Sequence, residues 1–478
     1  MLLMREVSAR REAERQFDQH VSLVAEVFAG RADLASVHGE KLARTLVAAV
    51  RSQLYEGVLP QRLRETVDGG ELVDPHWALS EVFPALPLLE KPLLSELGHH
   101  AFTREVREFL HYYESSGTTG NPIAAPKAVD DLVVNTVNIG EMWGRIVRPG
   151  DMAMILINAP FAPAAYQFEK VLEYLGVNSL RPWVDNITGD YSRVLRLVEE
   201  LAVNVFVGPP SRLLELIQFA RRQGAPIPRF DTLLLMAEQT GPSFVRHLER
   251  LTGARAFVAA YGSSETGTTA VSCEAGSLHL QVQSYLLELY DDSGTRLVDG
   301  RPDRGELVVT TLDLAARPLL RYRTGDLVEV DSGSCGCGLA LPVLRTQGRS
   351  QDVLSLTDRG IRQNDVEAMM WSPDAPKPVV LNYMLILRAG DVVCLTTTDE
   401  PPGGGWSEEM AARLAELFPG RRLVARAVEQ LPPLASLGQY LGWKLSRVLD
   451  LDEERNWDRL PGPIEVIVRQ TLDQLASS

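Results

Sequence analysis

Cysteine is scarce in this sequence: four residues in a chain of 478 are too few for a disulfide framework. No apolar run approaches the length of a membrane span. Basic residues are outnumbered, 48 against 63 acidic ones, and the net charge of −15 argues against a nucleic-acid partner, which would require a basic face. The first residues soon become charged, unlike a secretory signal. We therefore expect a cytoplasmic protein without a membrane or nucleic-acid partner.

The sequence also lacks a Walker A loop, in which a glycine is followed by Lys and then Ser or Thr. Its candidate for phosphate binding is a different loop, the run Ser-Ser-Gly-Thr-Thr-Gly at 115–120, which is followed by Asn121. The glycines let the backbone approach a ligand, and the hydroxyls can donate to phosphate oxygens. A flexible surface turn has the same composition, so the loop alone does not decide. Its residues are Ser115, Ser116, Gly117, Thr118, Thr119 and Gly120.

The order of predicted elements indicates an α/β fold. Residues 1–110 are mostly helical, and from 129 to 260 helices alternate with short apolar strands, which favours largely parallel pairing. Short strands after Glu288 indicate a β subdomain, and residues 353–478 form a last unit with its own helices and strands. The expected helices are 11–27, 42–54, 129–146, 163–175, 191–201, 211–222 (capped by Ser211), one from Ser243, 408–417 and 463–475. The expected strands are 152–157, 203–207, 232–236, 256–260, 285–290, 305–311, 327–330, 379–387 and 392–396.

Three further motifs follow the hydroxyl-rich loop. Residues 261–267 read Tyr-Gly-Ser-Ser-Glu-Thr-Gly, residues 321–326 read Arg-Tyr-Arg-Thr-Gly-Asp, and residues 348–352 read Gly-Arg-Ser-Gln-Asp. In this order and spacing the four segments resemble the adenylate-forming ligases, which include acyl-CoA synthetases and adenylation domains, and within them the phenylacetate–CoA ligase group. The resemblance spans most of the chain. It implies a large N-terminal domain, with a helical segment 1–110 and an adenylate-forming core 111–350, and a small mobile α+β domain at 351–478.

The resemblance assigns roles around a bound nucleotide. It implies that Glu265 holds Mg²⁺, a cation that prefers oxygen ligands, and that Tyr261 stacks near adenine. Asp326 would accept hydrogen bonds from the ribose hydroxyls, and Arg349 would pair with phosphate or ribose oxygens. Ser264 keeps the hydroxyl of the threonine that is usual at its place. The nucleotide-binding residues implied besides the loop 115–120 are Glu238, Tyr261, Gly262, Ser263, Ser264, Asp326 and Arg349.

A second group of residues is assigned to the acid. By resemblance, Phe161, Tyr166 and Phe168 fall on the helix that walls the acyl site. Ala237 and Glu238 follow a predicted strand and match a stretch along the acyl and adenine pockets. Aromatic side chains on a helix are also what an ordinary core contains, so the aromatic assignment has an equally simple structural alternative.

The last assignments concern catalysis and domain movement. Asp352 matches the family's hinge residue, although Gln351 stands where an acidic residue is more usual. Lys444 matches the catalytic lysine, although Trp443 precedes it where glycine is usual. A surface turn and a surface lysine are the simpler alternatives for these two positions. The expected catalytic residues are Lys444, Glu265 and Arg349.

Three of the four cysteines suggest a metal centre. Cys273 is followed by His279, and Cys335 and Cys337 form a Cys-Gly-Cys-Gly run. Three Cys and one His make a complete tetrahedral set for structural Zn²⁺, and members of the phenylacetate–CoA ligase group carry a similar set. Reduced cysteines beside a surface histidine are the alternative. Cys394 lies in an apolar strand and is expected to be an inert core residue.

These motifs predict an ATP-dependent, AMP-forming ligase that adenylates a carboxylic acid. The resemblance implies an aromatic or aryl-acetic acid, coenzyme A as acceptor, and ATP, Mg²⁺ and Zn²⁺ as cofactors. One alternative retains adenylation but transfers the acyl group to an amine or a carrier-protein thiol, as in an amide synthetase of secondary metabolism. Another is a zinc- and nucleotide-binding scaffold without catalysis. A homodimer remains open.

Overall fold

The computed structural model describes residues 6–115, 122–158, 161–184, 189–333, 335–349, 354, 360–388, 390–429, 431, 447–452, 465–466 and 469–470. The chain divides into two compact units. Unit 1 comprises Met1–Ile155, Ala159–Leu180 and Val258–Ser350, and unit 2 comprises Leu156–Asn158, Arg181–Phe257 and Gln351–Ser478. Among the described helices, none is both long and apolar enough to cross a membrane.

The N-terminal part of unit 1 is helical, as the sequence predicts. Helix α1 (Val7–Phe28) confirms the predicted helix 11–27, but the predicted helix 42–54 is wrong at both ends. The Asp33 side chain caps α2 eight residues earlier, and Ser52 caps a separate 3₁₀ turn after α2 ends. The elements here are α2 (Leu34–Ala49), η1 (Gln53–Tyr55), α3 (Gln61–Asp68), α4 (Pro75–Trp77), η2 (Ala78–Val82), α5 (Phe83–Ala85), α6 (Lys91–Leu97), η3 (Gly98–Ala101) and η4 (Val106–Glu108).

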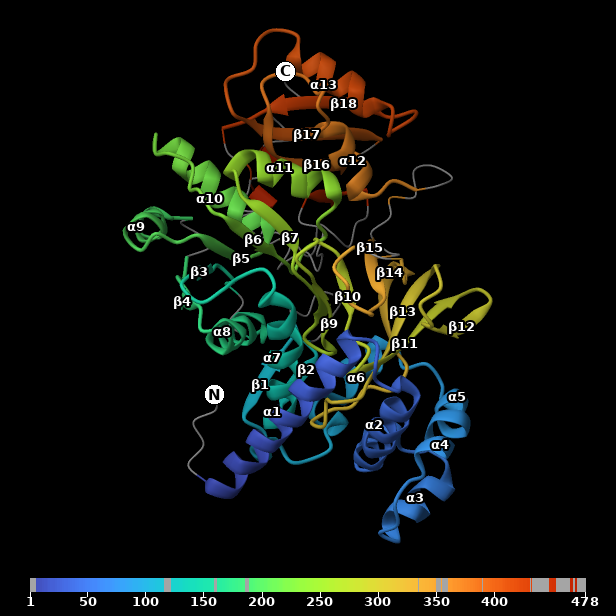
Figure 1. Ribbon diagram of the computed structural model, residues 1–478. Helices are drawn as coiled ribbons and strands as arrows, with labels where there is room; N and C mark the ends of the chain where they lie inside the picture. The colour runs from blue at the N-terminus through green and yellow to red at the C-terminus, as the bar shows by residue number, and fades with distance from the viewer. Residues whose placement is uncertain are drawn as a thin grey trace. The chain divides into compact units, whose positions relative to one another are not determined.

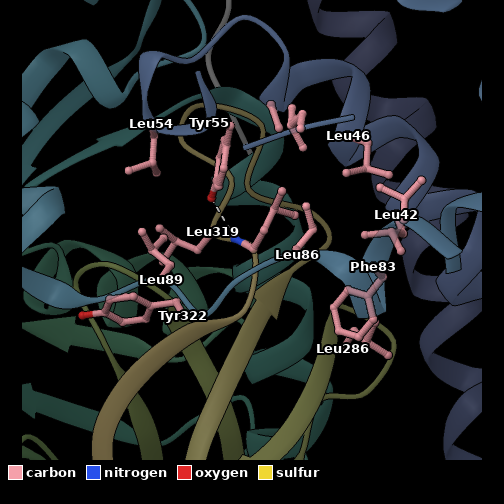
Figure 2. Packing of buried hydrophobic residues seen from close by; sticks show 14 of the residues in the cluster. Leu42, Leu46, Leu54, Tyr55, Phe83, Leu86, Leu89, Leu286, Leu319 and Tyr322 are labelled. Carbon is pink, nitrogen blue, oxygen red and sulfur yellow. Dashed lines mark hydrogen bonds between the residues drawn. The ribbon is translucent and has the colours of Figure 1, made fainter. Parts of the chain in front are cut away.

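A buried apolar cluster joins these helices to the segment that precedes the predicted ribose motif (Figure 2). Leu42 and Leu46 from α2 and Phe83 from α5 belong to the same cluster as Leu319. At its centre the Tyr55 hydroxyl donates to the carbonyl of Pro318 (2.9 Å) and accepts from the amide of Leu320 (2.8 Å). The helical segment therefore fixes the backbone of residues 318–320, next to the candidate site.

Two short pairs of strands and two helices follow in unit 1. Strand β1 (His111–Glu114) is antiparallel to β2 (Ala124–Lys127), and β3 (Met152–Ile155) is parallel to β4 (Asn178–Leu180). The predicted helices 129–146 and 163–175 correspond to α7 (Val129–Trp143) and α8 (Ala164–Tyr174). Helix α7 ends three residues early because Ile146 and Val147 both turn back to the carbonyl of Trp143.

The larger sheet of unit 1 has eight strands in the order β12-β11-β13-β14-β15-β10-β9-β8 (Figure 1). The predicted strand 327–330 is too short, because β14 already begins at Tyr322 and so contains most of the 321–326 motif. Pairing of β14 with β15 places Asp326 directly opposite Arg349. The strands are β8 (Ala260–Ser263), β9 (Gly267–Ser272), β10 (Leu278–Leu280), β11 (Tyr285–Asp291), β12 (Gly294–Leu297), β13 (Asp303–Thr311), β14 (Tyr322–Asp331) and β15 (Val343–Arg349).

Unit 2 combines an α/β part with a sheet near the C-terminus. Strand β5 is parallel to β6, with β7 next to β6, and a second sheet has the order β18-β17-β16-β19. The prediction that Ser211 caps a helix is wrong, because Pro210 is the first residue of α10 and the Ser211 hydroxyl donates to Glu238 instead. Within the predicted helix 463–475, the structure describes residues 465–466 and 469–470, and these are helical. The elements are α9 (Ser192–Glu200), β5 (Val205–Gly208), α10 (Pro210–Arg222), β6 (Thr232–Leu235), α11 (Pro242–Thr252), β7 (Arg255–Val258), α12 (Gln363–Met370), β16 (Val380–Arg388), β17 (Asp391–Thr398), α13 (Trp406–Ala415), β18 (Arg422–Ala427) and β19 (Val448–Asp450).

Aromatic side chains form the core of unit 2 where α11 meets α12. The imidazole of His247 stacks on Trp371, with ring centroids 4.2 Å apart and planes 9° apart, and donates from Nε2 to the Leu381 carbonyl (2.9 Å). Phe244 stacks on the same indole. Because His247 is 1% exposed, burial lowers its pKa to about 3. This histidine is therefore a neutral core residue at ordinary pH.

Candidate active site and metal centre

The Tyr261–Gly267 motif folds as a tight antiparallel hairpin between β8 and β9. Ser263 pairs with Gly267, whose φ of +76° favours glycine. Reciprocal hydrogen bonds between Ser263 and Thr266 (3.2 and 3.3 Å) close the turn. The predicted strand 256–260 is two strands, β7 and β8, so Tyr261 and Gly262 lie within β8 instead of following a strand, and Ser264 and Glu265 lie in the turn. The hairpin therefore presents Glu265 from a constrained backbone.

Glu265 is a buried carboxylate facing a cation that the sequence reading missed. Its side chain is 4% exposed, and the Lys91 ammonium lies 3.4 Å from Oε1. Burial alone would raise the pKa of Glu265, but Lys91, then a hydrogen bond from the Glu265 backbone amide, and then Arg317 outweigh it and hold that pKa below its usual value. Glu265 is thus an ionised oxygen ligand of the kind that a hard cation such as Mg²⁺ prefers.

Lys91 reaches Glu265 because its own segment is bound to the start of β14. The amide of Leu89 donates to the carbonyl of Arg321 (2.9 Å), and the amide of Arg323 donates to the carbonyl of Leu89 (3.0 Å). Arg323 also pairs with Glu90 at 2.8 Å. These contacts join positions more than 200 residues apart, and no local pattern around Lys91 signals them.

Asp326 joins Tyr261 and Arg349 in one cluster. The Tyr261 hydroxyl donates to Oδ2 (2.8 Å) and Arg349 Nε donates to Oδ1 (3.3 Å). Burial, and then the Asp326 charge, keep the pKa of Tyr261 far above its usual value, so its phenol remains a neutral donor. The structure therefore brings together three side chains that the sequence assigned to the nucleotide.

The hydroxyl-rich loop begins beside the same hairpin. Ser115 closes its base: the Ser115 amide donates to the Ile123 carbonyl (2.8 Å), and the Ser115 hydroxyl accepts from the Ile123 amide (2.9 Å). Several predicted site residues lie outside the described part of the chain, namely Ser116, Gly117, Thr118, Thr119, Gly120, Asp352 and Lys444.

Two buried cations connect the loop's second strand to the hairpin. Lys127, in β2, donates to the Ser264 carbonyl at 3.4 Å. Arg317 donates to the carbonyl of Glu265 at 3.4 Å and to that of Ala124 in β2. Burial lowers the pKa of Lys127 to about 8, against an opposing effect of Asp131. The sequence reading gave neither cation a role.

The residues predicted for the acid are not brought together as a set. Phe161 precedes helix α8 instead of lying on it and is 73% exposed. Phe168 is a core residue, stacked on Trp143 at 5.1 Å. Tyr166 is half-buried in an aromatic group with His111 (centroids 4.5 Å apart) and Tyr113 (6.3 Å).

Ala237 and Glu238 belong to unit 2. Ala237 is exposed and adopts a left-handed backbone with φ of +69°, which directs the turn after β6. The Glu238 carboxylate accepts from both the hydroxyl and the amide of Ser211. Burial is the main cause that raises its pKa. Glu238 therefore has a structural partner that the sequence did not indicate.

The four predicted metal ligands converge at one point of unit 1. The ligand atoms of Cys273, His279, Cys335 and Cys337 all lie within 4.8 Å of one another. The Sγ atoms of Cys273 and Cys335 are 3.7 Å apart, which fits two thiolates each about 2.3 Å from one tetrahedral zinc. His279 Nε2 lies 3.2 Å from Cys335 Sγ.

Hydrogen bonds around this cluster orient its donor atoms toward one another. His279 donates from Nδ1 to the Leu341 carbonyl (3.0 Å), so Nε2 keeps its lone pair directed at the sulfurs. Arg145 holds the Cys337 carbonyl (2.8 Å) and pairs with Glu274. Burial, and then the neighbouring Cys335 thiol, raise the pKa of Cys337 to about 12, a cost that a bound cation would reverse by favouring thiolate. By contrast, Cys394 is buried in β17, as expected.

Comparisons with known proteins identify relatives of this chain. A family model described as AMP-binding enzyme matches residues 110–316. The phenylacetate-coenzyme A ligase of Thermus thermophilus is 30% identical over 329 residues, 64% of this chain and 69% of that enzyme. The Escherichia coli enzyme of the same name is 25% identical over 69% of this chain and 74% of its own length.

The fold also matches that of solved ligases. A 2-hydroxyisobutyryl-CoA ligase, solved in the postadenylation state with 2-HIB-AMP, aligns over 92% of each chain with a TM-score of 0.69 and 17% identity. That likeness concerns the fold, which is the large α/β domain and smaller C-terminal domain that the sequence predicts. Since the Thermus enzyme is matched at 30% identity over more than two thirds of its length, this chain belongs to the phenylacetate-coenzyme A ligase family of AMP-binding enzymes.

Proposed function

We propose that this chain is an ATP-dependent, AMP-forming ligase that activates a carboxylic acid as its adenylate and transfers the acyl group to coenzyme A. The observation that carries the proposal is the grouping in unit 1 of an ionised Glu265, the Tyr261–Asp326–Arg349 cluster and the base of the hydroxyl-rich loop. Family membership supports the same reaction.

Each side chain has a role in this proposal that its surroundings support. Asp326 accepts from the ribose hydroxyls, and Tyr261 packs near adenine. Arg349 and the loop 115–120 bind phosphate oxygens. Glu265 holds Mg²⁺, which when bound neutralises phosphate charge. Because Lys91 occupies Glu265 in the structure, the metal–nucleotide complex must draw the carboxylate from that ion pair.

The C-terminal residues complete the proposal. Residues 351–478 act as a small domain that turns about Asp352, and Lys444 supplies a cation for attack of the carboxylate on the α-phosphate. Positioning and charge neutralisation then provide most of the rate. The boundaries near 110 and 350, the catalytic roles of Lys444, Glu265 and Arg349, and a cytoplasmic site of action are all part of this proposal.

The acid we propose is aromatic. Tyr166, Tyr113 and His111 form a half-buried aromatic group at the strand that leads into the hydroxyl-rich loop, and aromatic faces suit an aryl ring. Release of pyrophosphate should be measured over a panel of aryl and alkyl acids, with coenzyme A, an amine or a carrier-protein thiol as acceptor. If none of the acids in the panel supports release of pyrophosphate, the proposal is contradicted. If the acyl group is transferred only to an amine or a carrier protein, the proposed acceptor is wrong.

We also propose a structural zinc ion held by Cys273, His279, Cys335 and Cys337. The support is the complete donor set, the convergence of its atoms and the hydrogen bond that orients His279. With four protein ligands, no position remains for a water molecule, so the ion would have no catalytic part. Its role would be to tie β9 and β10 to the loop between β14 and β15, and β14 carries Asp326.

A further inference from the structure

Two consecutive carbonyl groups of the β8–β9 turn face two buried cations. The carbonyl of Ser264 accepts from Lys127 and that of Glu265 accepts from Arg317, each at 3.4 Å. Lys127 is 6% exposed and Arg317 is 3% exposed. Arg317 also donates to the carbonyl of Ala124, so β2, the turn and the segment before β14 are joined through two side chains.

Burying these charges is costly and the visible contacts compensate for little of it. Lys127 has three donors and one long hydrogen bond, and Arg317 Nε has no partner within the described part of the chain. Glu265 and Asp131 are the carboxylates whose charges act on both cations, and burial raises the pKa of Asp131 to about 6 despite Lys127. Apolar side chains could fill this part of the core without the cost of burying a charge, so we infer that the two cations have a role other than packing.

Both cations act on the one turn whose geometry matters for the metal. The carbonyls on either side of the Glu265 Cα are both held, and Lys91 contacts its carboxylate at 3.4 Å. The backbone of Arg317 is itself fixed, because Tyr55 binds the neighbouring Pro318 carbonyl and Leu320 amide. The support therefore extends from the helical N-terminal segment to the turn.

We propose that Lys127 and Arg317 are positioning residues that clamp the Ser264–Glu265 turn to β2 and so direct the Glu265 carboxylate at the metal ion of the bound nucleotide. The inference rests on the proposed function, since it assumes a metal–nucleotide ligand. It predicts a selective defect. Loss of either cation weakens binding of the metal–nucleotide complex, while binding of metal-free nucleotide, which depends on Tyr261 and Asp326, is retained.

The test is equilibrium binding, independent of turnover. Mn²⁺·ATP binding is followed by the loss of the free Mn²⁺ signal in electron paramagnetic resonance, and ATP binding in EDTA by calorimetry, for Lys127→Met, Arg317→Met and wild type. Each substitution removes one hydrogen bond from a charged donor to a carbonyl of the turn, so we expect Mn²⁺·ATP affinity to fall about tenfold and metal-free ATP affinity to change less than about twofold. Arg317→Lys, which keeps the charge and loses the fork, should recover part of the affinity.

Lys41→Met is the matched control. Lys41 is also a buried lysine of unit 1, 6% exposed, but it pairs with Asp313 at 2.6 Å and does not contact the hairpin. The Lys41→Met variant should have a lower melting temperature and an unchanged affinity for Mn²⁺·ATP.

Equal effects of Lys127→Met, Arg317→Met and Lys41→Met on both ligands would overturn the clamp, as would no binding of Mn²⁺·ATP by the wild type. If the wild type binds Mn²⁺·ATP and releases no pyrophosphate with any acid, the proposed reaction fails while the clamp stands. Should Lys127→Met not fold, the comparison of Arg317→Lys with Arg317→Met decides.

Discussion

Asp326→Ala tests whether this carboxylate is the ribose acceptor. In the structure its two oxygens already accept one hydrogen bond each, from Tyr261 (2.8 Å) and Arg349 (3.3 Å). A carboxylate offers about four lone-pair sites, so about two remain for the ribose hydroxyls. Loss of only one of these hydrogen bonds to a charged acceptor costs about 1.5–3 kcal/mol, so the variant should bind ATP at least about 10- to 150-fold more weakly.

Tyr261→Phe is the control for this prediction. It removes the donor at Asp326 Oδ2 but keeps an aromatic ring, so the ribose can occupy the freed site and ATP affinity should change less than about threefold. Affinity is measured by calorimetry with EDTA present, which removes the contribution of metal, and thermal melting confirms that each variant folds. Unchanged ATP affinity in a folded Asp326→Ala variant would refute the ribose assignment. Equal losses in both variants would show that Tyr261, not the carboxylate, dominates binding.

Three more predictions follow from the metal cluster, the core of unit 2 and the C-terminal lysine. Elemental analysis should find one zinc per chain, lost in Cys335→Ser with a lower melting temperature and kept in Cys394→Ser, and a stable metal-free wild type would contradict the site. The pKa of His247 falls from 6.5 to about 3 on folding, so the unfolded state binds the extra proton between these values, and this residue alone should lower stability by about 1.4 kcal/mol per unit as pH drops below 6.5. In chemical denaturation, His247→Gln should reduce the wild-type slope of stability against pH by that amount and a control substitution at the exposed His99 should not, and a His247→Gln variant that keeps the full slope would refute the assignment. Lys444→Ala should reduce acid-dependent pyrophosphate release by about 10²–10³ yet transfer the acyl group of a supplied acyl adenylate at near wild-type rate, and equal losses would indicate another role.

The sequence predicted the parts of this site whose chemistry is local. The motif at 261–267 and the Asp326 motif are short runs, and the Cys/His set consists of two short runs, 273–279 and 335–337, which the structure brings together. The predicted ends of the helix 42–54 were wrong because capping side chains set the actual boundaries: Asp33 caps the start of α2, and Ser52 caps the separate turn that follows it. A pattern of apolar residues predicts that a helix exists more reliably than where it stops, because the stop depends on one or two side chains.

The residues that were missed owe their roles to tertiary packing. Lys91 precedes Pro92 in a segment that looks like a helix start, and only its attachment to β14 brings it to Glu265. Phe161 and Phe168 looked alike as aromatic residues on a predicted helix, yet one is 73% exposed and the other is core. Composition and spacing cannot separate such cases, because the partner that distinguishes them lies far away in the sequence.

The net charge of the whole chain does not describe the charges at the candidate site. The chain carries a net charge of −15, which by itself would repel a polyanion such as ATP. Around the hairpin, however, the cations Lys91, Lys127, Arg317 and Arg349 face the carboxylates Glu265, Asp131 and Asp326. All of these groups are buried or half-buried, so screening of their charges by solvent is weak. The net charge of the whole chain therefore does not argue against a small anionic ligand, because the field at this site is set by the few charges placed around Glu265.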